Sequence, residues 1–78
     1  MDIKDPKFGQ WLDEQEAEAG RVKQRADHRQ RQATEMLMHV NQLRMLIGRV
    51  GDQNVEVDSS QVETLVEKIK DLRIKIAQ

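Results

Sequence analysis

Residues 36–50 of the chain read MLMHVNQLRMLIGRV, and nine of these fifteen residues are apolar. Five of the nine recur at alternating spacings of four and three: Met36, Val40, Leu43, Ile47 and Val50. Such a 3.5-residue period is typical of a helix that keeps one seam against a partner helix. The other four lie on further faces of the same helix: Leu37, Met38, Met45 and Leu46. We therefore expect a helix here that more than one neighbour covers.

The same spacing continues toward the N-terminus as far as position 8. The seam positions on that side are Phe8, Leu12, Gln15, Ala19, Val22, Ala26, Arg29 and Ala33. Only Gln15 and Arg29 interrupt the apolar seam. A period held over this length predicts that residues 8–50 share one inner face.

The bounds of this helix follow from the residues that flank it. The Asp-Pro pair at positions 5 and 6 is a start signal, because Asp accepts a hydrogen bond from a first-turn amide and Pro suits the first helical position. A glycine at 48 or 51 would end the helix. We therefore expect one helix over residues 6–50. A break near Gly20 is the alternative, which would make residues 6–19 a separate short helix in a three-helix bundle.

Residues 51–58 are predicted to form a connector, and residues 59–77 a second helix that Asp58, Ser59 or Ser60 caps. The second helix repeats its apolar residues at spacings of three and four: Val62, Leu65, Val66, Ile69, Leu72 and Ile76. At ~1.5 Å per residue it covers only about residues 32–50 of the first helix. We therefore predict a single all-α domain over residues 1–78. It is a helical hairpin with a long N-terminal helix, a shorter C-terminal helix, coiled-coil-like packing and a projecting arm over residues 8–35.

Composition supports helices and limits the chemistry. The chain has 78 residues, of which 37% are hydrophobic and 35% charged, with two aromatic residues, one proline and a net charge of −1. A chain this short has no room for a second domain or a large catalytic core. The absence of cysteine excludes disulfides and thiolate chemistry. No stretch predicts a transmembrane helix or a signal peptide, so we expect a cytoplasmic protein without membrane contact.

No pattern in the sequence predicts catalysis, a metal or a cofactor. His28 and His39 are eleven residues apart, too far along one helix to share a metal ion. Glu35 and His39 are neighbours at i,i+4, but two ligands fall short of the three or four that zinc requires. We therefore expect a protein that is not an enzyme.

Apolar helix faces predict a protein-interaction module instead. The candidate contact residues are Phe8, Trp11, Leu12, Met36, Leu37, Met38, Met45 and Leu46. Methionine suits such a role because its unbranched side chain adapts to a partner surface. We expect a homo-oligomer, with a dimer favoured, a helical protein partner, or both, in the manner of a small adaptor, co-chaperone, assembly subunit or inhibitor. The aromatic pair has a second interpretation, as a staple that pins the helix end to its own oligomer.

Charge along the predicted arm suggests a way for two copies to pair. An acidic block over residues 13–18 precedes a basic block over residues 21–31, and Ala19, Ala26 and Ala33 recur seven residues apart. Antiparallel pairing of two arms would set acid against base and bring the small residues together. The simpler interpretation is that the charges form a solvated helix face.

The basic block also supports an alternative function, a small nucleic-acid-binding regulator. The candidate phosphate contacts are Arg21, Arg25, Arg29 and Arg31. Arginine side chains along a helix bind phosphates well. The neighbouring acidic block and the lack of a base-stacking motif weigh against this alternative.

Overall fold

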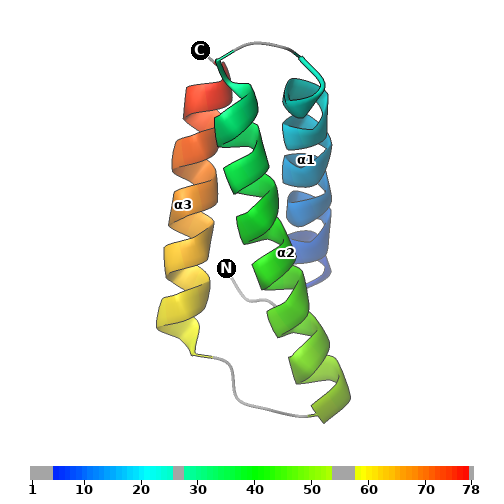
Figure 1. The fold of residues 1–78 in the computed structure, drawn as a ribbon. Coiled ribbons are helices and arrows are strands. Elements are labelled where there is room, and N and C mark those ends of the chain that lie inside the picture. Colours follow the sequence, from blue (N-terminus) through cyan, green and yellow to red (C-terminus); the bar gives the residue numbers. More distant parts are fainter. Residues whose placement is uncertain (1–4, 26–27, 54–57, 78) are drawn as a thin grey trace.

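The structure is a computed structural model that describes residues 5–25, 28–53 and 58–77, with backbone only for residues 49–53. It contains three helices: α1 (Pro6–Lys23), α2 (Gln30–Gln53) and α3 (Ser59–Ala77). Figure 1 shows them side by side in an up-down-up arrangement, with α2 antiparallel to both α1 and α3. The described residues include no strand. The all-α prediction is therefore confirmed.

The helix starts follow their local sequence. Asp5 caps α1 by accepting a hydrogen bond from the Lys7 backbone N–H at 2.9 Å, and Pro6 occupies the first turn as predicted. Asp58 caps α3 in the same way, because its carboxylate accepts the Ser60 backbone N–H at 2.9 Å. Of the three candidate caps at positions 58–60, Asp58 is the one used. The second helix has the bounds that the sequence predicts.

The expected continuous helix over residues 6–50 is wrong. The chain leaves α1 after Lys23 and enters α2 at Gln30, so the long dimension of the molecule is 41 Å. A continuous helix of that length would span about 67 Å. Folding back lets the seam of α1 pack against the chain's own helices, which removes apolar side chains from water. The segment predicted to project as an arm thus forms a third helix that packs in the bundle.

The break does not lie at a glycine. Gly20 is inside α1, and its carbonyl oxygen accepts the Gln24 backbone N–H at 3.3 Å. The alternative prediction of a three-helix bundle is therefore right about the number of helices. It is wrong about the position of the break and about a first helix that ends at residue 19. Likewise, α2 continues through both Gly48 and Gly51 to Gln53. A glycine inside a helix costs only about 1 kcal/mol relative to alanine, which packing of the apolar face readily offsets.

The predicted seam forms the core of one molecule. Its buried residues come from all three helices: Phe8, Leu12, Ala19, Val22, Ala33, Met36, Val40, Leu43, Val62, Leu65, Val66, Ile69, Leu72 and Ile76. The 3.5-residue period thus marks the faces that α1, α2 and α3 turn toward one another. Ile47 of the seam is half-buried, and Ala26 and the side chain of Val50 lie outside what the structure describes. The other described apolar residues of the seam are covered without a second copy.

The two polar interruptions of the seam both contact α3. Gln15 is only 4% exposed, and its Oε1 accepts a hydrogen bond from Arg73 Nη1 at 2.8 Å. Arg29 Nη1 donates to the backbone carbonyl oxygen of Ile76 at 3.2 Å. These polar groups are satisfied within the fold, as buried polar groups must be. They hold the second half of α3 against α1 and against the start of α2.

Candidate functional site

The aromatic end of the chain is part of the core. Phe8 and Leu12 are fully buried, and Trp11 packs half-buried beside them, its ring centroid 5.8 Å from that of Phe8. Phe8 and Leu12 therefore cannot contact a partner in this fold. Phe8 and Leu12 are therefore wrong as candidate contacts, because α1 packs against α2 and α3 instead of projecting from a hairpin.

The methionine-rich segment divides into inner, flanking and outer residues. Met36 is fully buried, which removes it from the candidate contacts. Leu37 and Leu46 are half-buried and pack against the core from the sides of α2. Met38 and Met45 are 56% and 62% exposed. They lie seven residues apart and therefore on the same outer face of the helix.

Among the described residues, one large exposed apolar side chain was not singled out by the sequence. Ile74 of α3 is 60% exposed, although it stands between the buried residues Leu72 and Ile76. Its offset from the three-and-four spacing of the buried residues was the available signal. It lies alone on a helix whose other exposed positions are mostly polar.

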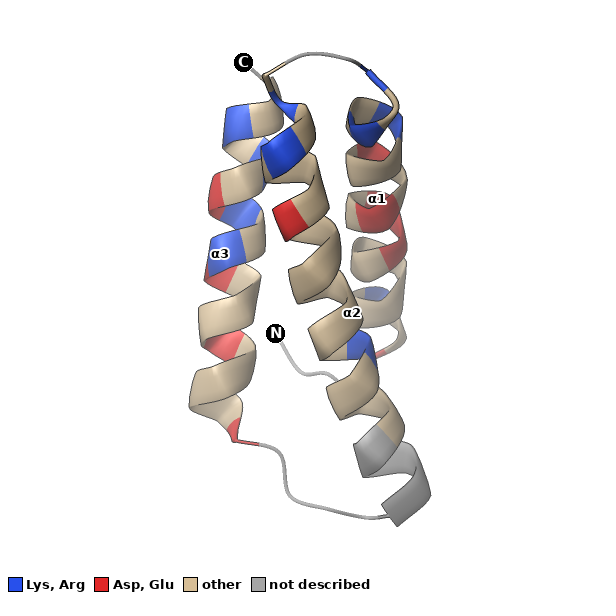
Figure 2. Cartoon of the chain, in the orientation of Figure 1, with Lys and Arg blue, Asp and Glu red and all other residues tan. Residues whose placement is uncertain are grey.

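The outer face of α2 between Met36 and Gly48 carries no exposed charge. Its exposed residues are Met38, Asn41, Gln42, Met45 and Gly48, which we call the uncharged face. Figure 2 shows this part of α2 mostly in tan. Its one Lys or Arg is Arg44. The outer surface of α3 differs, because six of its twelve exposed residues are charged. In a chain with 35% charged residues, a helix face without charge is a distinctive feature.

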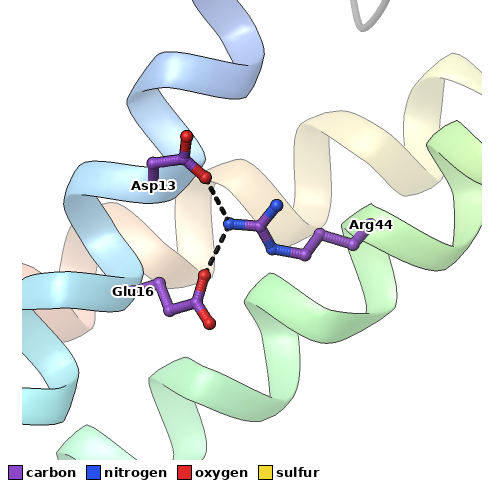
Figure 3. A network of polar contacts seen from close by, with 3 residues as sticks. All are labelled: Asp13, Glu16 and Arg44. Carbon is purple, nitrogen blue, oxygen red and sulfur yellow. Dashed lines mark hydrogen bonds and ion pairs between the residues drawn. The ribbon is translucent and has the colours of Figure 1, made fainter.

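Arg44 is turned away from the uncharged face and toward α1. Its Nη2 lies 2.6 Å from Asp13 Oδ1 and 2.6 Å from Glu16 Oε2 (Figure 3). The hydrogen bond to Asp13 is the largest influence on the pKa of Arg44 and raises it; burial opposes the rise, and Glu16 adds to it. Asp13 and Glu16 are exposed and Arg44 is half-buried, so this ion pair links α1 to α2 only modestly.

The acidic block thus has a partner that the sequence did not suggest. Asp13 and Glu16 pair with Arg44, and Glu18 pairs locally with Arg21. Ala19 and Ala33 are buried inside the monomer, and Ala26 lies outside the described residues. Antiparallel pairing of two projecting arms is therefore wrong for this fold, because the seam that would mediate it faces α2 and α3.

The predicted phosphate contacts occupy the end of the bundle where α1 meets α2. Arg21 and Arg25 are exposed near the end of α1, and Arg31 is exposed in the first turn of α2. Arg29 is half-buried against α3 through its bond to Ile76. They do not form one stripe on one helix, as the sequence suggested. Arg73 and Lys75 of α3 belong to the same end, a contribution that only the fold reveals.

The described residues show little other chemistry. His39 Nδ1 lies 3.4 Å from Gln42 Oε1, an ordinary surface contact. Nowhere in the described ranges do three His, Cys, Asp or Glu residues gather in a way that could hold a metal ion. None of the described helices is long and apolar enough to cross a membrane.

Comparisons with protein-family models, with curated proteins and with solved structures gave no match. Function must therefore be inferred from the geometry of the described residues.

Proposed function

We propose that the protein is a non-enzymatic protein-interaction module and that the uncharged face of α2 is its interface. The observation that carries the proposal is the exposure of Met38 and Met45 on a face without charge. Depletion of charge and enrichment in methionine distinguish the centres of protein interfaces from the rest of a surface. The thioether side chain also adapts its shape to a partner.

The partner that best suits this face is a helix, and a second copy of the chain is the simplest source of one. Two uncharged faces can pack antiparallel about a twofold axis near Asn41 without opposing like charges. A bundle of this size buries a modest core, so association would also add stability. We therefore favour a dimer. The role of such a module would be that of an adaptor, co-chaperone, assembly subunit or inhibitor.

This interface is smaller than the one that the sequence suggested. Phe8, Leu12 and Met36 are inside the monomer, so Met38 and Met45 remain as the exposed apolar contacts, with Leu37 and Leu46 at the sides. A small interface of this kind is typical of reversible complexes rather than obligate ones. We expect concentration-dependent association.

Sedimentation or light scattering over a wide range of protein concentration tests the proposal. The test variant is the double substitution Met38→Glu with Met45→Glu, since glutamate keeps the helix propensity and adds charge to the face. Ile74→Glu is the matched control, because Ile74 is equally exposed on another helix. We expect the wild type and the control to associate and the double variant to remain monomeric, with circular dichroism unchanged in all three.

A monomeric wild type would direct the test to a foreign partner. In that case, the wild type, the double variant and Ile74→Glu should each be used to capture proteins from a lysate of the source organism. The wild type and Ile74→Glu should capture a protein that the double variant does not. Hydrogen exchange in the reconstituted complex should then show protection of residues 37–48. A wild-type monomer whose captured proteins are the same for all three variants would contradict the proposal.

A further inference from the structure

Cationic side chains from all three helices gather at one end of the bundle. Residues 21–31 and 72–77 contain seven Lys and Arg and one Asp, a formal charge of +6, which leaves −7 for the other residues of a chain with net charge −1. We call this the basic end, and its cations are Arg21, Lys23, Arg25, Arg29, Arg31, Arg73 and Lys75. Figure 2 shows basic positions concentrated where α1 ends, α2 begins and α3 ends.

Two hydrogen bonds hold the three parts of the basic end together. Gln30 Nε2 donates to the Lys23 carbonyl oxygen at 3.1 Å, which joins the start of α2 to the end of α1. Arg29 Nη1 donates to the Ile76 carbonyl oxygen at 3.2 Å, which joins it to the end of α3. The cations therefore belong to one packed surface rather than to a loose segment.

Helix stability explains only part of this arrangement. Cations in the last turn of a helix interact favourably with its dipole, which accounts for Arg21 and Lys23 in α1 and for Lys75 in α3. Arg31 is exposed in the first turn of α2, where the dipole disfavours a positive charge, and that turn contains no acidic residue. Its position is therefore better explained by an anion outside the chain than by the stability of α2.

Most of these cations are accessible. Arg21, Lys23, Arg25, Arg31 and Lys75 are exposed, and only Arg21 among these five has an ion pair within the described part of the chain, with Glu18. Arg29 is half-buried and joins this end to α3 through Ile76. Arg73 is also half-buried, and its guanidinium is bound to Gln15 in the middle of α1. Four exposed side chains thus remain without an ion-pair partner in that part of the chain.

We propose that the basic end binds the phosphate backbone of double-stranded nucleic acid. A polymer with closely spaced phosphates matches several cations on one surface, and each contact releases counterions. The chain has two aromatic residues: Phe8 is buried, and Trp11 lies near the opposite end of α1. The Phe, Tyr and Trp rings on which single-stranded bases stack are therefore missing from this surface, where the exposed His28 is the one ring side chain. The negative charge on the rest of the chain would orient the molecule with its basic end toward the duplex.

Binding of phosphates at the basic end does not depend on the proposed interface on α2. Met38 and Met45 lie outside the basic end, so the double variant that removes their apolar contacts leaves its seven cations in place. Each proposal can fail while the other holds.

Fluorescence anisotropy with a labelled, mixed-sequence DNA duplex tests the proposal. With about four phosphate contacts, the logarithm of the binding constant should fall against the logarithm of salt concentration with a slope of about −3.6. That slope corresponds to a loss of roughly a hundredfold in affinity between about 50 and about 200 mM salt. The double substitution Arg25→Gln with Arg31→Gln should weaken binding and reduce the magnitude of the slope by about 1.8.

The matched control is Lys7→Gln with Lys68→Gln, which removes the same charge from exposed positions outside the basic end. It should retain nearly the wild-type affinity and slope. Three outcomes would overturn the proposal: no binding to the duplex at low salt, equal weakening by the two double variants, or binding of polyglutamate as tight as that of the duplex. The last outcome would assign the basic end to acidic polypeptides instead.

Discussion

Helices α2 and α3 have similar inner faces but different outer faces. Both helices bury an apolar stripe against the core, including Leu43 in α2 and Ile69 in α3. On the outside, α3 exposes six charged residues, whereas α2 between residues 36 and 48 exposes none. Folding needs only the inner stripes. The difference between the outer faces therefore points to a role of α2 beyond folding. The charged outer face of α3 serves as the comparison, because it is typical of a helix face in contact with solvent.

The largest expected effect is on the free energy of unfolding, which should depend on the inner stripe of α2 and hardly at all on its outer face. Leu43→Ala should lower the free energy of unfolding by about 2–5 kcal/mol, because it leaves a cavity among fully buried neighbours. Met45→Ala, two residues away but 62% exposed, should change it by less than about 0.5 kcal/mol at concentrations where the protein is monomeric. Urea denaturation measures both. Similar losses for the two variants would show that the outer face of α2 also contributes to the core.

A smaller effect concerns the one arginine of α3 that supports the fold. Arg73→Ala should cost about 1–3 kcal/mol, because the buried Oε1 of Gln15 would lose its donor. Lys70→Ala, at an exposed position on the same helix, is the control and should be nearly neutral. Replacing Gln15 with Leu in the Arg73→Ala background should recover part of the loss. The comparison of the outer faces would need revision if Lys70→Ala were as costly as Arg73→Ala.

The smallest effect concerns the single charge within residues 36–48. Arg44→Gln should destabilise the protein by about 0.2–1 kcal/mol at low salt, since its contacts to Asp13 and Glu16 are partly exposed and screened. Lys68→Gln on α3 should have no measurable effect. Thermal denaturation at low and high salt provides the test. A loss that persists undiminished in high salt would mean that Arg44 acts through packing of its side chain rather than through charge.

Much of this fold follows from local sequence. The start of α1 at the Asp5–Pro6 pair, the bounds of α3 and the identity of the buried seam were all predictable from capping residues and period. The break between α1 and α2 was not. Residues 24–29 contain neither glycine nor proline, so no helix-breaking residue marks the turn there, and the packing of α1 against the other helices decides it. Gly20 did not mark the break either, because packing keeps it inside α1.

The candidate surfaces were only partly predictable. Met38 and Met45 are where the sequence suggested exposed contacts, but the burial of Phe8, Leu12 and Met36 depends on the third helix. The basic block over residues 21–31 was visible in the sequence. Its continuation through Arg73 and Lys75, more than forty residues away, depends on the helices ending side by side.

The contact between Gln15 and Arg73 bears on the handedness of the bundle. Three helices in an up-down-up arrangement can bury the same inner stripes with α3 on either side of the plane of α1 and α2. In the mirror arrangement, the flank of α3 that carries Arg73 would face α2 instead of α1. The buried amide oxygen of Gln15 would then lack its donor, a cost of about 1–3 kcal/mol. A single polar residue in the apolar seam thus helps to select one topology over its mirror image.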